Sequence, residues 1–269
     1  MSISAGFAGT SRLCVDLGRV SQGGGEDEGS WGGYGLAMRH VERLDEAVWP
    51  ALEHTAPLLV IPVGSCEQHG RHLPMSTDTL IATSLAERAV ALVDGALLGP
   101  PLTVTASGEH QGFPGTLSIG NQAMEAVVVE LVRSADWARG VVLVNGHGGN
   151  RTAVDAATRR LDHEGRRVLS WWPRVPDEID GGDLHAGHVE TSLLLALAPH
   201  LVDRSAARAG PALDRAAMTR VMSEGLRPVS PDGVLGDPTA ASADHGNELL
   251  GLLTGQLTAA IEAWDRSPT

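Results

Sequence analysis

The chain of 269 residues is poor in cysteine and lacks long apolar runs. Its two cysteines, Cys14 and Cys66, stand in unrelated contexts and give neither a disulfide framework nor a CxxC zinc site, so a reducing cytoplasm is the expected compartment. No apolar run approaches the roughly 18 residues that a membrane span needs. The N-terminus also lacks a basic region followed by an apolar one, so neither a membrane anchor nor an export signal is expected.

Clusters of basic residues are absent as well. Lys and Arg number 20 against 33 Asp and Glu, which gives a formal net charge of −13. Proteins that bind nucleic acid need clustered Lys and Arg to displace the counterions of the phosphates, so nucleic acid is not an expected partner. The hydrophobic content of 42% is ordinary for a globular protein that buries one sizeable core.

Residues 1–37 differ in composition from the rest of the chain. They are rich in Gly and Ser, contain the run GGGEDEG and show no sustained period, which predicts a disordered N-terminal extension before a single domain at 38–269. A better amphipathic pattern opens at Met38, so translation starting there is a further hypothesis. Mass spectrometry that found residues 1–37 in the native protein would overturn it.

From residue 58 onward, apolar runs alternate with segments of helical period. Strands are predicted at 58–63, 141–145 and 167–171, with another apolar segment at 97–104, and helices at 79–93, 121–139, 151–164, 188–198 and 244–265. Alternating elements of these lengths predict an α/β domain, with a mostly parallel sheet covered by helices on both faces. The turn-rich stretch 228–241 is expected to be a surface loop or a lid over the site.

Three loops carry candidate ligands for metal ions. Glu67, His69 and Asp78 follow the first predicted strand, and the carboxyl ends of adjacent parallel strands are where open α/β sheets place their sites. Glu67 and His69 are two residues apart, so their side chains point the same way in an extended loop. Taken singly, Asp78 also suits a helix N-cap, His69 a buried histidine and Glu67 a solvated surface acid. Because the three residues occur together directly after a buried strand, a set of metal ligands is favoured.

The second and third loops repeat this chemistry. NGHGGN places His147 among three glycines, where the alternative is a tight turn with an incidental histidine. HAGHVETS contributes His185, His188 and Glu190, although an acid at a helix N-terminus is favoured whatever the function. Mixed carboxylate and imidazole ligands suit Zn²⁺, Mn²⁺ or Fe²⁺, and five such ligands are enough for two divalent ions.

Other hydrolase chemistries find less support in the sequence. No GxSxG elbow of a serine hydrolase occurs, and Cys66 lies in the first loop without an evident base at a defined spacing. A metal-dependent hydrolase is therefore the most economical interpretation.

Four motifs together resemble the creatininase family of metal-dependent amidohydrolases: EQHGxHLP with a following TDT, FPGTLSIG, NGHGGN and HAGxxETS, which cover most of residues 58–197. The resemblance implies a compact three-layer α/β/α sandwich, a binuclear metal site and, commonly, a homohexamer. Matched by motif, Glu67, Asp78 and His147 would bind one ion, and His69 with the bridging Asp78 would bind the other.

The chain departs from the creatininase pattern at Gly149, where creatininase has an acidic ligand. The second ion would then need another carboxylate, for which Glu190 is the candidate. The same change puts creatinine turnover in doubt. His185 resembles the catalytic histidine of the family and would pass a proton to the leaving amine.

Three segments, SGEHQGFPGTLSIG, DLHAGHVETS and VSPDGVLGDPTAA, resemble a peptidase subgroup of this family. That resemblance implies a modified precursor peptide as substrate, cut near its C-terminus to release a dipeptide unit derived from Val-Tyr. Glu109, His110 and Phe113 are candidates for the substrate pocket; the alternative is an ordered loop packed by Phe113 and Pro114.

His72 and His188 are candidates for orienting the ligands through hydrogen bonds. Two rival functions stay open: a creatininase-type small-molecule amidohydrolase or deformylase, and a non-catalytic binding module that holds metal only for stability.

Overall fold

The computed structural model describes residues 40–176, 183–211 and 215–267. The predicted disordered extension at 1–37 and the start hypothesis at Met38 lie outside the described residues and stay predictions. Met38–Thr269 forms one compact unit.

The core of the fold is a four-stranded sheet in the order β2-β1-β3-β4, in which every pair is parallel. The strands are β1 (Leu58–Val63), β2 (Ala96–Leu98), β3 (Gly140–Asn145) and β4 (Val168–Trp171). All residues of the two central strands, β1 and β3, are buried, as expected when helices cover both faces of a parallel sheet.

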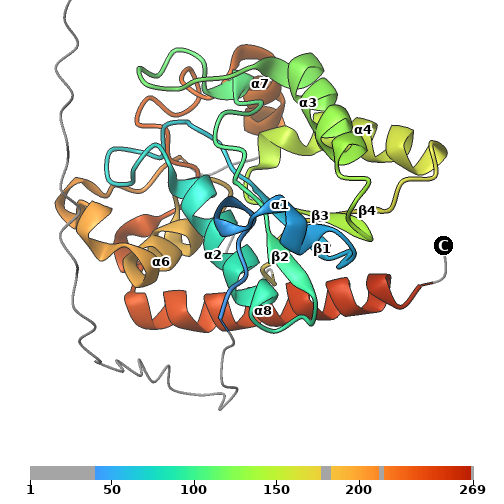
Figure 1. Ribbon diagram of the computed structural model, residues 1–269. Helices are drawn as coiled ribbons and strands as arrows, with labels where there is room; N and C mark the ends of the chain where they lie inside the picture. Colours follow the sequence, from blue (N-terminus) through green and yellow to red (C-terminus); the bar gives the residue numbers. More distant parts are fainter. Residues whose placement is uncertain (1–39, 177–182, 212–214, 268–269) are drawn as a thin grey trace, which may run out of the picture. The chain divides into compact units, whose positions relative to one another are not determined.

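Helices cover the sheet on both faces (Figure 1). One face carries α2 (Thr77–Val90), α6 (His188–Leu197) and α8 (Ala243–Asp265), and the other carries α3 (Gly120–Ser134) and α4 (Arg151–His163). Leu58 and Val60 of β1 join the core on the α8 side, while Leu59 and Ile61 join the core on the α3 side, because successive side chains of a strand point to opposite faces. The predicted three-layer α/β/α sandwich is confirmed.

Shorter elements connect these layers: α1 (Trp49–Leu52), α7 (Arg215–Glu224) and the 3-10 turns Leu44–Glu46, Gly108–His110, Gly148–Asn150, Pro199–Leu201, Arg204–Ala206 and Pro238–Ala240. The apolar segment predicted at 97–104 gives only the short strand β2, since Pro100 and Pro101 follow it and proline cannot donate to a sheet. The helix predicted at 121–139 ends at Ser134.

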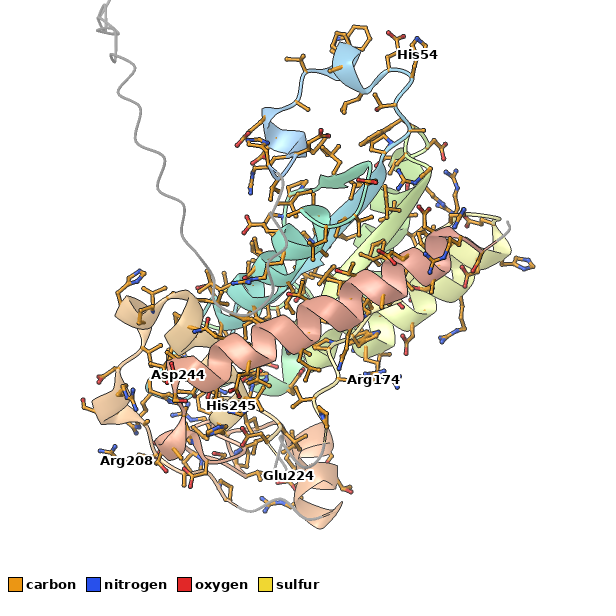
Figure 2. All side chains as sticks on the ribbon, turned by 90° about the horizontal axis from the view of Figure 1, so that it is seen from below. His54, Arg174, Arg208, Glu224, Asp244 and His245 are labelled. Atoms are coloured by element: carbon orange, nitrogen blue, oxygen red, sulfur yellow. The ribbon has the colours of Figure 1, made fainter. Side chains whose placement is uncertain are left out.

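The long helix α8 runs along one face of the sheet, as the view from below shows, with Asp244 and His245 in its first turn (Figure 2). It packs against α6 and α2. Among the described residues, no helix is long and apolar enough to cross a membrane.

Candidate metal centre

The candidate site lies where β1 and β3 end. The last residues of the two strands, Val63 and Asn145, are paired, so the loops that follow them start side by side. The first turn of α2 approaches the same point, and Gly146 makes room for it, because a Cβ there would collide with the main-chain oxygen of Asp78. The expected convergence of these loops at the carboxyl edge of the sheet is confirmed.

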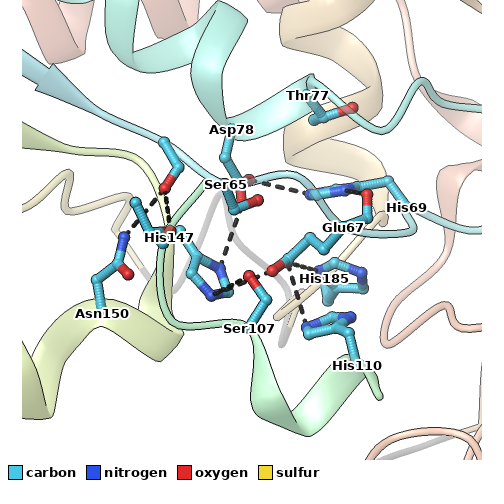
Figure 3. Close-up of polar contacts among 12 residues, drawn as sticks. Ser65, Glu67, His69, Thr77, Asp78, Ser107, His110, His147, Asn150 and His185 are labelled. Carbon is cyan, nitrogen blue, oxygen red and sulfur yellow. Dashed lines mark hydrogen bonds and ion pairs between the residues drawn. The ribbon is translucent and has the colours of Figure 1, made fainter. Parts of the chain in front are cut away.

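Asp78 lies between His69 and His147 (Figure 3). Its carboxylate lies 3.0 Å from Nε2 of His69 and 3.2 Å from Nδ1 of His147. Ser65 donates a hydrogen bond of 2.7 Å to the same carboxylate. The N-cap residue of α2 is Ser76, and Asp78 lies within the first turn, so its side chain serves the cluster and not the helix end.

Glu67 is fully buried, and three imidazoles surround it. Its carboxylate oxygens lie 3.2 Å from Nε2 of His110, 3.1 Å from Nε2 of His147 and 3.8 Å from Nδ1 of His185. None of these contacts has the alignment of a hydrogen bond, and neither oxygen has a hydrogen-bond partner among the described residues. A buried carboxylate without hydrogen bonds is costly, and a bound cation would offset that cost.

Three imidazoles of the cluster share one hydrogen-bonding pattern. Nδ1 of His69 lies 3.2 Å from the main-chain oxygen of Glu67, Nε2 of His147 lies 3.0 Å from that of Ala106, and Nε2 of His185 lies 2.8 Å from that of Gln68. A carbonyl oxygen only accepts, so each of these nitrogens donates, and the other ring nitrogen is left without a proton in the neutral form. Metal-binding histidines are typically oriented in this way.

The ligand atoms fall into groups that could each hold one ion. Glu67, Asp78 and His147 form one group, and His69, Asp78 and Glu190 form a second, with ligand atoms within 4.8 Å of one another in each. Asp78 belongs to both groups, as a bridging carboxylate should. A third combination joins Glu67 and His69 to His185. The residues therefore fit a pair of divalent ions.

The electrostatics of the cluster also favour cations. Burial opposes a charge on His69, but the carboxylates of Asp78, Glu190 and Glu67 outweigh it and raise the pKa of its imidazole to about 10. Burial likewise opposes a charge on His147, yet neighbouring carboxylates raise its pKa well above the usual value. These shifts mean that the carboxylates create a strongly negative potential, which protons neutralise when no metal ion is bound.

Glu190 lies in the first turn of α6 and faces His69. Its carboxylate is 3.8 Å from Nε2 of His69 and accepts a 2.6 Å hydrogen bond from the main-chain N–H of Ala186. Burial and the charge of Asp78 raise its pKa to about 7, against the opposing effect of His69. Gly149 stands where creatininase has an acidic ligand, and a side chain at this position would collide here with the Glu109 carboxylate.

His185 faces Glu67 from the loop before α6. Its ring centroid is 4.3 Å from that of His69 and 4.5 Å from that of His110. Burial, and then the neighbouring imidazoles, hold its pKa well below the usual value, so it is neutral. The main chain of His185 pairs with Leu235, which places the turn-rich stretch 228–241 against the site.

The substrate-pocket candidates divide into two kinds. Oε1 of Glu109 lies 3.4 Å from Nε2 of His147, and His110 lies against Glu67, so both face the cluster. Phe113 instead packs against a separate small apolar cluster with Leu226 and under the guanidinium of Arg227. That position matches the alternative in which Phe113 orders the loop.

The candidates for orienting ligands have other partners. Nε2 of His72 lies 2.9 Å from the hydroxyl of Thr191, so any influence on a ligand passes through the neighbour of Glu190. Nε2 of His188 lies 2.7 Å from Nδ1 of His245 at the start of α8. The hydrogen bond of His188 thus goes to α8 and not to a proposed ligand, which corrects the expectation for this residue.

Three further polar residues of the site were missed in the sequence, namely Ser65, Gln68 and Asn150. Asn150 holds the NGHGGN loop in place, donating to the oxygens of Gly64 and Asn145 and accepting from the N–H of Ala106. The position of Asn150 at the end of the glycine-rich loop was the signal in the sequence that could have identified it. Cys66 donates to the carbonyl of Gly115, 3.7 Å away.

A cavity of about 230 Å³ opens beside the cluster. His185, Glu190 and Asp183 supply its polar groups, and its walls are mostly apolar side chains: Ile81, Pro173, Val175, Leu184, Val189, Leu193 and Leu253. A small apolar group can therefore lie next to the proposed proton donor.

Comparison with known proteins agrees with this geometry. The profile of the creatininase family, described as creatinine amidohydrolase, matches residues 45–261. A mycofactocin precursor peptide peptidase of Mycobacterium ulcerans (strain Agy99) is 43% identical over 228 residues, covering 81% of this chain and 89% of that protein.

Two solved structures show the same fold. A zinc–zinc form of a creatininase variant has a TM-score of 0.68 at 27% identity, over 84% of this chain and 98% of that chain. A manganese form of creatininase has a TM-score of 0.67 at 26% identity, over 83% and 98% of the two chains. Because the family profile spans most of the sequence and the relative is similar over nearly its whole length, this chain belongs to the creatininase family.

Proposed function

We propose that this chain is a metal-dependent peptidase that hydrolyses an amide bond near the C-terminus of the modified mycofactocin precursor peptide and releases the dipeptide unit derived from Val-Tyr. The observation that carries the proposal is the buried Glu67 carboxylate, which has no hydrogen bond to any described residue and lies among the imidazoles of His110, His147 and His185. The similarity to the mycobacterial peptidase supports the choice of substrate.

The proposed ligands are Glu67, Asp78 and His147 for one ion, and His69, Asp78 and Glu190 for the other. Fe²⁺, Zn²⁺ and Mn²⁺ all accept this donor set. When bound, two such ions supply Lewis acidity, which makes a water nucleophilic near neutral pH and polarises the scissile carbonyl.

His185 carries the proton between water and the leaving group. Its Nε2 donates to the main-chain oxygen of Gln68, so its free Nδ1 lone pair faces Glu67, 3.8 Å away. Because the ring is neutral, Nδ1 can take a proton from the attacking water and then give it to the nitrogen of the leaving amine. The C–O bond forms first and the carbonyl carbon becomes tetrahedral; the C–N bond then breaks as the nitrogen takes up the proton, and the products are a carboxylate and a free amine.

The apolar cavity beside His185 and Glu190 suits the leaving unit. Its volume of about 230 Å³ is on the scale of one large side chain, and its walls come mainly from aliphatic residues. We place the apolar part of the Val-Tyr-derived unit there, so that its amine lies next to the imidazole that protonates it.

The proposal is tested by incubating the full chain, loaded with Fe²⁺ or Zn²⁺, with the matured precursor peptide and, in parallel, with creatinine and a formylated amide. Mass spectrometry should detect a released dipeptide unit, and the two small amides should be unchanged. An Asp78→Asn variant should be inactive, whereas an exposed Glu130→Gln variant should act like the wild type.

Each rival function predicts a different result. Turnover of creatinine or of the formylated amide without peptide cleavage would favour a small-molecule amidohydrolase. A chain that binds metal and cleaves none of the three would be a binding module.

A further inference from the structure

Gln68 lies between two proposed ligands, and its side chain reaches the two histidines of the site that the proposed ligand set leaves out. We propose that Gln68 is a positioning residue that gives His110 and His185 opposite hydrogen-bonding roles: His110 presents an N–H to the substrate, and His185 presents a lone pair. The inference rests on the proposed function, because it names two groups that would act on the same amide.

The orientation of the Gln68 amide follows from its main-chain partners. The N–H of Gly70 donates to Oε1 over 2.9 Å, and the Nε2 group donates to the carbonyl of Gly233 over 3.3 Å. The reverse orientation would set two donors against each other at Gly70 and two acceptors at Gly233. Because the residue is only 5% exposed, solvent has little access to relieve such a mismatch.

The amide then determines which nitrogen of His110 carries the proton. Nε2 of Gln68 lies 3.0 Å from Nδ1 of His110, and an amide nitrogen only donates. Nδ1 of His110 must therefore accept, and the proton of the neutral ring is on Nε2. That N–H points to the cluster, 3.2 Å from Oε1 of Glu67 but without the alignment of a hydrogen bond, so it is free to donate to a substrate oxygen.

The main chain of the same residue determines the tautomer of His185. Nε2 of His185 is 2.8 Å from the carbonyl oxygen of Gln68, which only accepts, so this nitrogen donates and Nδ1 is the bare one. The amide of Gln68 also lies 3.1 Å from Nε2 of His185. Nε2 of His185 cannot accept from this amide, because it already carries the proton that it donates to the carbonyl oxygen of Gln68.

The two imidazoles thus face the reaction region with opposite polarity. In hydrolysis of an amide, negative charge develops on the carbonyl oxygen while a proton moves from water to the leaving nitrogen. The N–H of His110 is suited to the oxygen, and the lone pair of His185 is suited to the proton. Gln68 touches neither reacting group and acts through both rings.

The test replaces the donor of Gln68 by an acceptor of the same shape. In Gln68→Glu, the carboxylate favours a proton on Nδ1 of His110, so the ring should change tautomer, whereas His185 should keep its proton on Nε2. NMR of ¹⁵N-histidine-labelled, zinc-loaded protein reads both tautomers, with signals assigned by their loss in His110→Gln and His185→Gln. Gln111, the exposed residue that follows His110, provides a matched control. In Gln111→Glu, neither imidazole should change its tautomer.

Activity gives a second readout. Loss of one oxyanion donor should lower kcat of Gln68→Glu for the peptide by about 10²-fold, with KM and metal content unchanged. Wild-type His110 protonated on Nδ1 would overturn the proposal even if the variant failed to fold, and so would an unchanged His110 tautomer in Gln68→Glu. The NMR readout needs no substrate, so a failure of the proposed peptidase activity can be told apart from a failure of this assignment.

Discussion

An imidazole can donate, accept or bind a metal, and the residues around each histidine of this site decide which role is open to it. His69 and His147 each donate one N–H to a main-chain carbonyl and face Asp78 with the other nitrogen. His185 makes the same kind of bond but lies farther from the carboxylates, at 3.8 Å from Glu67. The distance between each imidazole and the carboxylates therefore distinguishes the proposed ligands, His69 and His147, from the proposed proton carrier, His185.

Replacing His185 tests that separation. His185→Ala should lower kcat by about 10²- to 10⁴-fold, the usual contribution of a general acid or base, while the protein keeps both ions, because its five proposed ligands remain. Kinetics with the peptide, together with metal analysis, measure both effects, and the exposed His200→Ala serves as the control. Loss of an ion would instead place His185 among the ligands, in the combination with Glu67 and His69.

At the residue scale, the sequence predicted which acids and histidines would lie close together. It did not predict the hydrogen bonds that hold their side chains in place. The order of the motifs was enough to predict that Glu67, Asp78 and His147 would lie close together. The pairing of His188 with His245 could not be read from the chain, since the two residues are 57 positions apart and meet only where α6 crosses α8. The link from Gln68 to His185 spans 117 positions and is equally hidden.

At the element scale, the predictions were most accurate for the central strand and less so at helix ends. The strand at 58–63 has the predicted bounds, because its unbroken apolar run defines where the strand begins and ends. The helix predicted from 79 starts at Thr77, since Asp78, a good cap by type, is drawn into the first turn by Ser65 and the two histidines. Tertiary contacts of this kind override local preference.

The crossing of α6 and α8 offers a paired test of packing. A Cβ on Gly246 would collide with the main-chain oxygen of Ser192 in α6, whereas one on Gly251, in the same helix, would meet no atom of the described residues within 4 Å. Gly246→Ala should lower the free energy of unfolding by about 1–3 kcal/mol through overpacking. Gly251→Ala should raise it by about 0.5–1 kcal/mol, because glycine in a helix costs entropy. Urea titrations of both variants measure the difference, and equal effects would contradict the close crossing.

At the scale of the whole molecule, charge is the dominant feature. The chain carries a formal net charge of −13, and the cluster concentrates carboxylates in its interior. Both favour uptake of cations over binding of polyanions. The homohexamer implied by family resemblance stays a prediction, which light scattering of the purified protein would check.

Metal affinity should rise with pH. In the metal-free protein the pKa of His69 is raised to about 10, that of His147 well above its usual value and that of Glu190 to about 7, so binding of the two ions must displace protons from His69 and His147 throughout the neutral range and a further one from Glu190 below pH 7. Apparent affinity should increase about tenfold per pH unit for each displaced proton, and more steeply at pH 6 than at pH 8. Competition with a chromogenic chelator at several pH values measures this slope. An affinity that does not vary with pH would contradict the proposed ligands.

The proposed centre draws on both central strands, and this has a consequence for biosynthesis. Glu67, His69 and Asp78 leave the ribosome early, but His147 follows only after α2, β2 and α3 have been translated, and Glu190 later still. The pocket for either ion is incomplete until the strand pairs of the sheet have formed. Loading of both proposed ions must therefore follow synthesis of the chain as far as Glu190.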